Sequence, residues 1–149
     1  MPARILIADD YEDNRELLRL ILTTAKYQVL EARDGRECVE LAKSQLPDLI
    51  MIDLSMPRLD GWEVFRILRK DARTSSIPLV AATASAVTDR ARALEAGFTA
   101  YLTKPFHTAE LLELVREVLS SRALKASAAE TGVGPGRGEE GSTPAINQK

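Results

Sequence analysis

The sequence predicts an α/β protein in which a parallel sheet is covered by helices on both faces. Short apolar runs alternate with amphipathic stretches along residues 1–122, which is typical of parallel strands joined by helical crossovers. Two of the runs, LIMID and LVAAT, are apolar at successive positions, as central strands buried on both faces are. The composition, 45% hydrophobic and 28% charged, is that of an ordinary globular protein.

The elements are predicted from the lengths and periods of these runs. The predicted strands cover residues 4–8, 28–32, 48–54, 78–83 and 99–103. The predicted helices cover residues 12–24, 36–44, 60–70, 87–96 and 108–122.

Turn signals separate the elements in order. The first run, RILIA, has the length of a buried strand, and the helix after it places four residues on one face: Leu17, Leu18, Ile21 and Leu22. Gly35 and Gly61 are expected to allow turns with φ > 0 before the second and third helices. Pro47 breaks the chain before the third strand, and Gly97 is a stop signal for the fourth helix.

Composition excludes several classes of protein. The net charge of −2 provides no electrostatic footprint for nucleic acid. No apolar run approaches the ~20 residues of a membrane span, and the start of the chain does not resemble a signal peptide. Cys38 is the only cysteine, so no internal disulfide can form, and we expect a small buried hydrophobe there. We therefore expect a cytoplasmic protein with neither nucleic acid nor membrane as a partner.

The composition changes after residue 122. Residues 123–149 are rich in Gly, Ser, Pro and charge and carry almost no large apolar side chains. Such a segment cannot bury enough surface to offset the entropy of ordering. We expect a folded domain over residues 1–122 and a disordered tail over 123–149, for which a role as a binding peptide stays open.

Polar residues stand at the carboxyl ends of the predicted strands, where parallel sheets bind ligands. Asp9 and Asp10 follow the first strand, Asp53 ends the third, Thr83 ends the fourth and Lys104 follows the fifth. Three carboxylates in one cleft would repel one another. One lysine and one Mg²⁺ ion would bring the sum of charges to zero and allow an anionic phosphoryl group to bind.

Each of these residues also has an explanation without chemistry. Asp9 or Asp10 could cap the helix over residues 12–24. Thr83 could simply end a strand, and Lys104 could be a solvated charge. The coincidence of all of them at strand ends favours a shared site.

Four motifs, taken in order, carry a resemblance to a known family: Asp9-Asp10, the block DLSMPRLDG from Asp53 to Gly61, Thr83-Ala84, and Lys104-Pro105-Phe106. Over about residues 3–121 the chain resembles a receiver domain of bacterial two-component response regulators. It is similar to the stand-alone chemotaxis type and to single-domain cell-cycle regulators. The resemblance implies a flavodoxin-like receiver fold with five parallel strands in the order 2-1-3-4-5.

The resemblance also implies a role for each acid. Asp53 would accept a phosphoryl group from a phosphohistidine of a histidine kinase or a histidine phosphotransfer protein. Asp10 and Asp53 would bind Mg²⁺ through their side chains, with the backbone carbonyl of Ser55 as a third ligand. Asp9 would act through a metal-bound water.

Further roles are implied around the acids. Lys104 would pair with the phosphoryl oxygens, and Thr83 would hydrogen-bond the phosphoryl group. Tyr101 matches an aromatic switch position, although it could also be only a packed strand residue. Pro105 matches a position at which the peptide bond is cis. Ser55, together with Ser85, predicts a short to moderate lifetime of the phosphorylated state because both are small and hydroxylic.

The output is expected to be binding. The resemblance implies a downstream protein partner that meets the fourth helix, the fifth strand and the last helix, or a second copy of the chain that forms a homodimer. The last helix carries a broad apolar band: Leu111, Leu112, Leu114, Val115, Val118 and Leu119. Part of this band must pack on the sheet, and whether the rest meets a partner or is also core stays open.

Two other classes of function remain as alternatives. One is a binding module of the same fold that does not use phosphate, against which the complete set of acids argues. The other is a phosphatase with an aspartate nucleophile, which would need a second acid two residues after Asp53, where Ser55 stands. No phosphate-cradling GxxxxGK[ST] loop is present, so nucleotide binding is not expected. We expect no enzymatic activity beyond the domain's own phosphorylation and dephosphorylation.

Overall fold

The computed structural model describes residues 2–56, 58–84 and 87–131. The chain divides into two compact units after Val118. The fold described below is that of the first unit. Of the second unit, the structure describes only the continuation of the last helix to Thr131.

Five parallel strands form one sheet in the order β2-β1-β3-β4-β5. The strands are β1 (Arg4–Ala8), β2 (Gln28–Ala32), β3 (Leu49–Asp53), β4 (Leu79–Thr83) and β5 (Ala100–Thr103). The helices of the described residues are α1 (Glu12–Thr24), α2 (Gly35–Gln45), α3 (Gly61–Lys70), α4 (Val87–Ala96) and α5 (Thr108–Thr131). The predicted fold class and the strand order 2-1-3-4-5 are confirmed.

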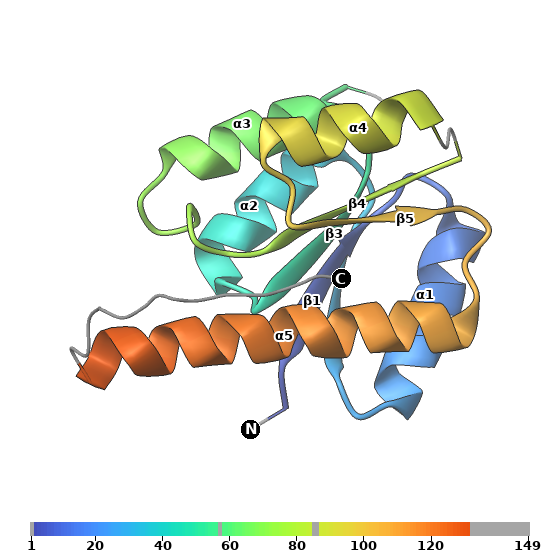
Figure 1. Cartoon of the computed structure of the whole chain (residues 1–149). Helices are drawn as coiled ribbons and strands as arrows, with labels where there is room; N and C mark the ends of the chain where they lie inside the picture. The colour runs from blue at the N-terminus through green and yellow to red at the C-terminus, as the bar shows by residue number, and fades with distance from the viewer. Residues whose placement is uncertain (1, 57, 85–86, 132–149) are drawn as a thin grey trace. The chain divides into compact units, whose positions relative to one another are not determined.

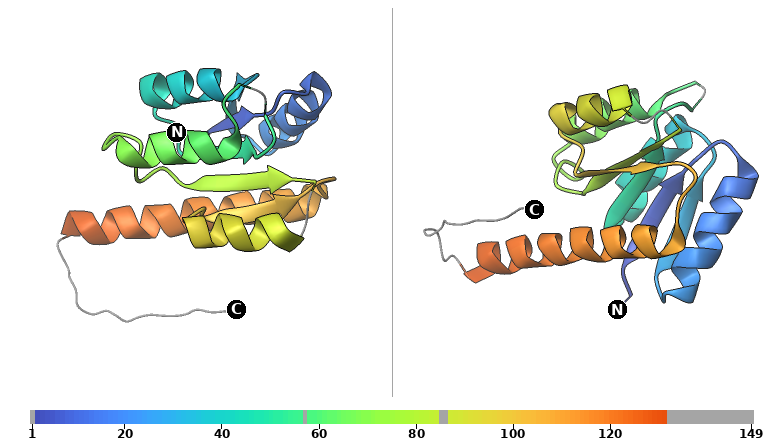
Figure 2. Two further views of the ribbon diagram at one scale, coloured as in Figure 1. Left: turned by 90° about the horizontal axis from the view of Figure 1, so that it is seen from above. Right: turned by 45° about the vertical axis from the view of Figure 1, so that its right-hand side comes forward.

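The sheet lies between two layers of helices. Helices α2, α3 and α4 lie on one face, and α1 with residues 108–118 of α5 lies on the other (Figure 1), as the right-hand view of Figure 2 also shows. All five residues of β3 and all five of β4 are buried, as predicted from their continuous apolar runs. The described residues include no helix that is long and apolar enough to cross a membrane.

The register brings the carboxyl ends of the strands to one edge of the sheet. Ala8 pairs with Ile52, so the chain leaves β1 beside the end of β3. Asp53 pairs with Ala82, one residue before Thr83. Thr83 in turn pairs with Thr103. Residues that follow these strands therefore meet at a common edge.

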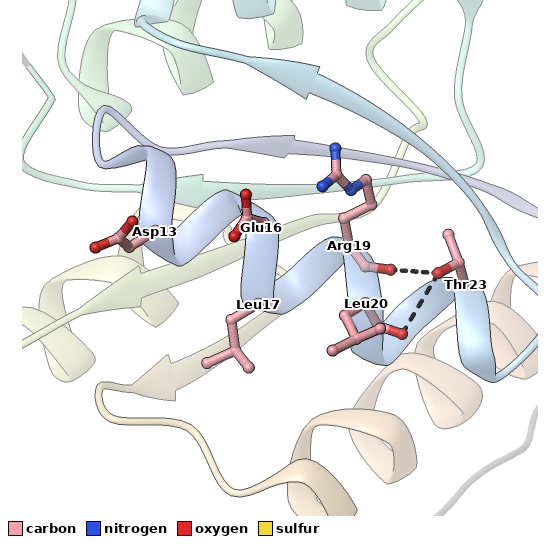
Figure 3. Close-up of a pocket in the computed structure, with 6 residues that line it drawn as sticks. All are labelled: Asp13, Glu16, Leu17, Arg19, Leu20 and Thr23. Atoms are coloured by element: carbon pink, nitrogen blue, oxygen red, sulfur yellow. Dashed lines mark hydrogen bonds between the residues drawn. The ribbon is translucent and has the colours of Figure 1, made fainter.

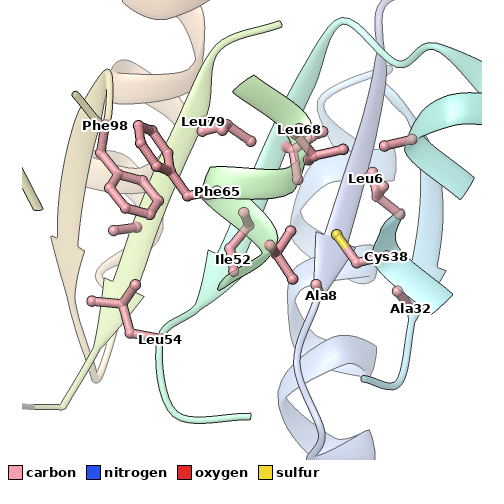
Figure 4. Close-up of a cluster of buried hydrophobic side chains, with 14 of the residues drawn as sticks. Leu6, Ala8, Ala32, Cys38, Ile52, Leu54, Phe65, Leu68, Leu79 and Phe98 are labelled. Atoms are coloured by element: carbon pink, nitrogen blue, oxygen red, sulfur yellow. The ribbon is translucent and has the colours of Figure 1, made fainter. Parts of the chain in front are cut away.

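A cluster of buried apolar side chains supports this edge from within (Figure 4). It joins Leu6 of β1 and Ile52 of β3 to side chains of α2 and α3. Phe65 of α3 stacks on Phe98, with 4.4 Å between ring centroids. Cys38 is fully buried in this cluster, and the desolvation raises the pKa of its thiol to about 12. The prediction of a small buried hydrophobe at Cys38 is confirmed.

Local signals set the ends of two helices: the stop at Gly97 was predicted, and the cap at Asp60 was not. Asp60 caps α3 by accepting a hydrogen bond from the Glu63 backbone N–H, while the Glu63 side chain accepts one from the Asp60 N–H. Gly97 ends α4 in the left-handed region, with φ of 114°. The N–H of Phe98 donates to the carbonyl of Ala93 at 3.0 Å, which closes a Schellman motif.

Two expectations about helices were wrong. Leu17, placed on the core face by its periodicity, is 50% exposed, and the buried residues of α1 are Arg15, Leu18 and Leu22. Helix α5 continues to Thr131 rather than ending at residue 122. The added stretch is rich in alanine and contains Lys and Glu, residues whose high helix propensity supports a helix without large apolar side chains. The rest of the tail predicted over residues 123–149 lies outside the described residues.

Candidate functional site

Three aspartates come together at the carboxyl edge of the sheet. Asp9 follows β1 directly and is 2% exposed, Asp53 ends β3 and is 6% exposed, and Asp10 is exposed. One carboxylate oxygen from each residue lies within 4.8 Å of the other two. The predicted convergence of these acids is therefore observed, with two carboxylates buried and one facing solvent.

Lys104 lies between the two buried carboxylates. Its Nζ is 2.9 Å from Asp9 Oδ2 and 3.1 Å from Asp53 Oδ2. Burial lowers the pKa of Lys104, but the hydrogen bonds and negative charges of Asp9 and Asp53 outweigh it, so the pKa lies above its usual value. The two carboxylates therefore favour the charged ammonium and fix its position. Lys104 is not the solvated charge of the alternative explanation.

The other oxygens of the buried acids also have donors. Asp9 Oδ1 accepts the backbone N–H of Tyr11 at 2.9 Å, and Asp9 Oδ2 accepts Asn14 Nδ2 at 3.3 Å. Asp53 Oδ1 accepts the N–H of Ser55 at 2.9 Å. Charged carboxylates tolerate burial when they are paired and hydrogen-bonded in this way. The capping interpretation fails, because Tyr11 is the N-cap residue of α1 and makes no side-chain cap.

The ends of β4 and β5 complete this edge. Thr83 is buried one residue beyond the position that pairs with Asp53, and its carbonyl accepts the backbone N–H of Lys104 at 2.9 Å. This bond ties the position of Lys104 to the end of β4. The peptide bond between Lys104 and Pro105 is cis, the isomer implied by the resemblance. Ser85 lies outside the described residues.

Tyr101 is separate from the acid cluster. It pairs with Ala81 in the register of β5 on β4 and packs, half-buried, against the apolar cluster of the core. The structure thus brings Asp9, Asp10, Asp53 and Lys104 together, with Thr83 at the same edge, and leaves Tyr101 two positions before the pair of Thr83 and Thr103 in the register.

Two glycines act differently from the prediction. Among the described glycines only Gly97 has a positive φ, so Gly35 and Gly61 do not serve left-handed turns. Both instead permit close approach. A Cβ on Gly61 would lie 2.8 Å from the carbonyl oxygen of Asp53, and one on Gly35 would lie 1.9 Å from that of Leu59. Helix α3 can therefore start directly against the residue that bears the central carboxylate.

Sequence reasoning missed a buried arginine. Arg15 of α1 donates from Nη1 to the backbone carbonyl of Asp9 at 2.7 Å. The sequence did contain a signal that Arg15 is buried. Arg15 stands three residues before Leu18 and seven before Leu22, so it lies on the apolar stripe of the helix. A charge on that stripe indicates a buried partner.

The surface of the described residues is hollowed beside Asp10 and along α1. One hollow, of about 520 Å³, adjoins Asp10 and is lined by Arg33, Asp34 and Arg58. Arg58 Nη1 lies 2.8 Å from Asp34 Oδ2. The helix-capping bond from the Glu37 N–H, followed by the Arg58 side chain, lowers the pKa of Asp34. Guanidinium groups thus flank the open side of the acid cluster.

Another hollow, of about 410 Å³, lies along α1, and none of the three clustered aspartates lines it (Figure 3). Its lining includes the exposed Leu17 and Leu20 among charged residues. Nothing in the described residues shows what would cover it.

The acid cluster has the donors that a hard divalent cation needs. Its ligand atoms are carboxylate oxygens, which Mg²⁺ prefers, and no sulfur or imidazole ligand belongs to the cluster within the described residues. Asp10, the exposed member, is open to solvent. Asp9, Asp10 and Asp53 therefore fit an Mg²⁺ ion.

Comparison with known proteins gives the same assignment. The sequence matches the family described as response regulator receiver domain over residues 5–116. Response regulator MprA of Mycolicibacterium vanbaalenii is 44% identical over 120 residues, which are 80% of this chain and 51% of MprA. The chain thus spans about half the length of that relative.

Solved structures share the fold. The receiver domain of sensor histidine kinase PA1611 from Pseudomonas aeruginosa has a magnesium ion coordinated in its active site cleft. It is 32% identical with a TM-score of 0.76, covering 80% of this chain and 99% of that one. Chemotaxis protein CheY4 of Vibrio cholerae is 28% identical with a TM-score of 0.75, covering 79% of this chain and 99% of that one. By its sequence and its fold, this chain belongs to the response regulator receiver domain family.

Proposed function

We propose that this chain is a phospho-accepting response regulator in which Asp53 takes a phosphoryl group from the phosphohistidine of a partner. Receiver domains are non-catalytic signalling modules that partner with histidine kinases. The observation that carries the proposal is the arrangement at Asp53, where one lysine and two further carboxylates surround a single carboxylate at a strand end.

The transfer is a displacement at phosphorus. A carboxylate oxygen of Asp53 attacks the phosphorus atom, the bond from phosphorus to the histidine nitrogen breaks, and the electron pair returns to the imidazole. The product is a mixed anhydride on Asp53. Catalysis of such a step needs mainly in-line positioning and neutralisation of charge.

The chain's own residues supply most of these needs. The Ser55 N–H holds Asp53 Oδ1 at 2.9 Å and so fixes the orientation of the carboxylate. Lys104 Nζ, at 3.1 Å from Asp53 Oδ2, carries the positive charge that phosphoryl oxygens would meet. Bound Mg²⁺, held by the side chains of Asp10 and Asp53 and the Ser55 carbonyl, with Asp9 acting through a metal-bound water, would supply the remaining positive charge for both the carboxylates and the phosphoryl oxygens.

Signalling would follow from a shift between two states of the domain. Thr83 follows Ala82, the residue that pairs with Asp53, and would donate its hydroxyl to a phosphoryl group. Tyr101 is half-buried at the edge strand, where a change of its packing would alter the surface of β5. On α5, Leu111, Val115 and Val118 are buried while Leu112 and Leu114 are half-buried, which leaves part of the apolar band for a downstream protein or a second copy.

The test is covalent labelling of the full chain. The protein is incubated with acetyl phosphate and Mg²⁺, and then with a phosphorylated histidine phosphotransfer protein, and the intact mass is recorded. A gain of one phosphoryl group that disappears in Asp53→Asn supports the proposal. Asp13→Asn, the same change at an exposed acid of α1, serves as the control and should label like the wild type.

Other results would favour the alternatives. Absence of label with both donors would support a receiver fold that does not use phosphate. Continued turnover of an external phosphate ester, beyond one phosphoryl group per chain, would support a phosphatase.

A further inference from the structure

Arg15 is a buried cation that the proposed chemistry does not use. It is 7% exposed and shares the buried face of α1 with Leu18 and Leu22. Burying a charge costs several kcal/mol unless partners compensate. The partners of Arg15 should therefore show what the site gains from it.

Both partners of Arg15 belong to the edge that carries the acids. Nη1 donates to the backbone carbonyl of Asp9 at 2.7 Å. Nε lies 3.4 Å from Glu31 Oε1, an ion pair whose geometry is not that of a hydrogen bond. The guanidinium is thus anchored on β2 and holds one specific peptide unit at the end of β1.

That peptide unit joins Asp9 to Asp10. Asp9 is held independently, because its carboxylate has Lys104, Asn14 and the Tyr11 N–H as donors. Asp10 has no such support: within the described residues its carboxylate makes no hydrogen bond or ion pair. The direction of the Asp10 side chain therefore depends on its backbone, and so on the carbonyl that Arg15 holds.

We infer that Arg15 is a positioning residue for divalent cation binding, acting through the Asp9 carbonyl to keep the Asp10 carboxylate in the acid cluster. This inference rests on the part of the proposed function that places Mg²⁺ at these acids. Outer partners of metal ligands typically change metal affinity by about 10–100-fold when they are removed.

A purely electrostatic role for Arg15 would have the opposite sign. A positive charge close to the site repels Mg²⁺, so loss of that charge alone would strengthen cation binding. Loss of the bond to the Asp9 carbonyl would instead free the Asp10 peptide and weaken binding. The direction of the change in affinity separates the two roles.

The chain offers a matched control for this comparison. Arg19 stands one turn further along α1 and pairs with the same Glu31, at 3.1 Å, but its side chain is 48% exposed. Its guanidinium donates to Glu31 rather than to Asp9. Arg19→Gln therefore removes the same charge from the same helix and leaves the Asp9 carbonyl bond in place.

The experiment measures Mg²⁺ affinity directly, from backbone amide chemical shifts during stepwise addition of MgCl₂ to the full chain. We expect Arg15→Gln to weaken Mg²⁺ binding about tenfold. Arg15→Lys, which keeps the charge and can reach only one of the two partners, should lie between Arg15→Gln and the wild type. Arg19→Gln should stay within about twofold of the wild type.

Circular dichroism establishes that each variant is folded before the comparison, and Arg15→Lys carries the test if Arg15→Gln does not fold. Unchanged or tighter Mg²⁺ binding in a folded Arg15 variant would overturn the inference, as would an equal loss in Arg19→Gln. Because no phosphodonor is present, the result is distinguishable from failure of phosphorylation. A wild-type chain that binds Mg²⁺ but is not labelled at Asp53 leaves the inference intact, and one that does not bind Mg²⁺ refutes it.

Discussion

Removing the charge of Asp10 should make the protein more stable when no divalent cation is present. Asp10 is exposed and lies in a cluster whose three carboxylate oxygens are within 4.8 Å of one another. Each of its two neighbours therefore repels it, while Lys104, which pairs with both of those neighbours, attracts it. In Asp10→Asn both repulsions vanish and the side chain keeps its size.

The magnitude follows from Coulomb's law. Two unit charges 4.8 Å apart repel by about 0.9 kcal/mol in bulk water and by about 3.5 kcal/mol at an effective dielectric constant near 20. Because Asp10 is exposed, the value near that of water applies to each of its two repulsions. The attraction of Lys104 offsets about one of them, which leaves a net gain of about 1 kcal/mol for Asp10→Asn.

Urea unfolding followed by circular dichroism measures this gain. In EDTA the midpoint should rise by about 0.5 M, and high salt should reduce the difference by screening. Excess Mg²⁺ should reverse the order, because binding at ten times the dissociation constant stabilises the wild type by about 1.4 kcal/mol, while the variant, which lacks one carboxylate of the cluster, should gain less than about 0.4 kcal/mol.

Asp13→Asn is the matched control, since it removes the same charge from the first turn of α1. It should lower stability by about 0.3–1 kcal/mol, because an acid at a helix N-terminus is favourable. A loss of stability for Asp10→Asn in EDTA would refute the reasoning. So would an equal increase from Mg²⁺ in the wild type and the variant.

Three further predictions concern the frame of the site. Gly61→Ala should lower the free energy of unfolding by about 1–3 kcal/mol. The added Cβ would lie 2.8 Å from the Asp53 carbonyl oxygen, so α3 would have to move. A urea midpoint equal to that of the wild type would contradict this prediction. Asp60→Ala should cost about 1 kcal/mol by removing the cap that accepts the Glu63 N–H, and Asp60→Asn, which keeps an acceptor, should restore most of it in thermal unfolding. Cys38, buried and with a pKa raised to about 12, should not react with a thiol reagent at mildly alkaline pH until urea unfolds the chain. Labelling of the folded protein at the rate of a free thiol would show that Cys38 is accessible.

Much of the site could be predicted because a parallel sheet imposes its geometry on the sequence. Once the strands were placed, Asp9, Asp53, Thr83 and Lys104 had to meet, since the carboxyl ends of parallel strands share one edge. The strands were recognisable because continuous apolar runs such as LIMID and LVAAT are typical of central strands. The capping box at Asp60 and the stop at Gly97 are also local, and each depends on a few adjacent residues.

What the sequence alone did not determine depends on contacts between distant segments. Gly35 appeared to serve a turn, yet its need for glycine comes from Leu59, a residue of another loop. Leu17 and Arg15 stand on the same helix, and periodicity favoured the leucine for the core. Only the tertiary structure shows that Arg15 is buried instead, with one hydrogen bond to the Asp9 carbonyl and an ion pair with Glu31.

The division follows from the range of the interactions. Strand formation, helix capping and the order of the motifs arise from neighbours in the chain, so the sequence by itself determined the fold class and the residues at the strand ends. Close packing and the pairing of buried charges arise from residues far apart in the chain. The tertiary structure therefore decided which glycines are needed for contact, which helix face is buried, and how Arg15 supports the acid cluster.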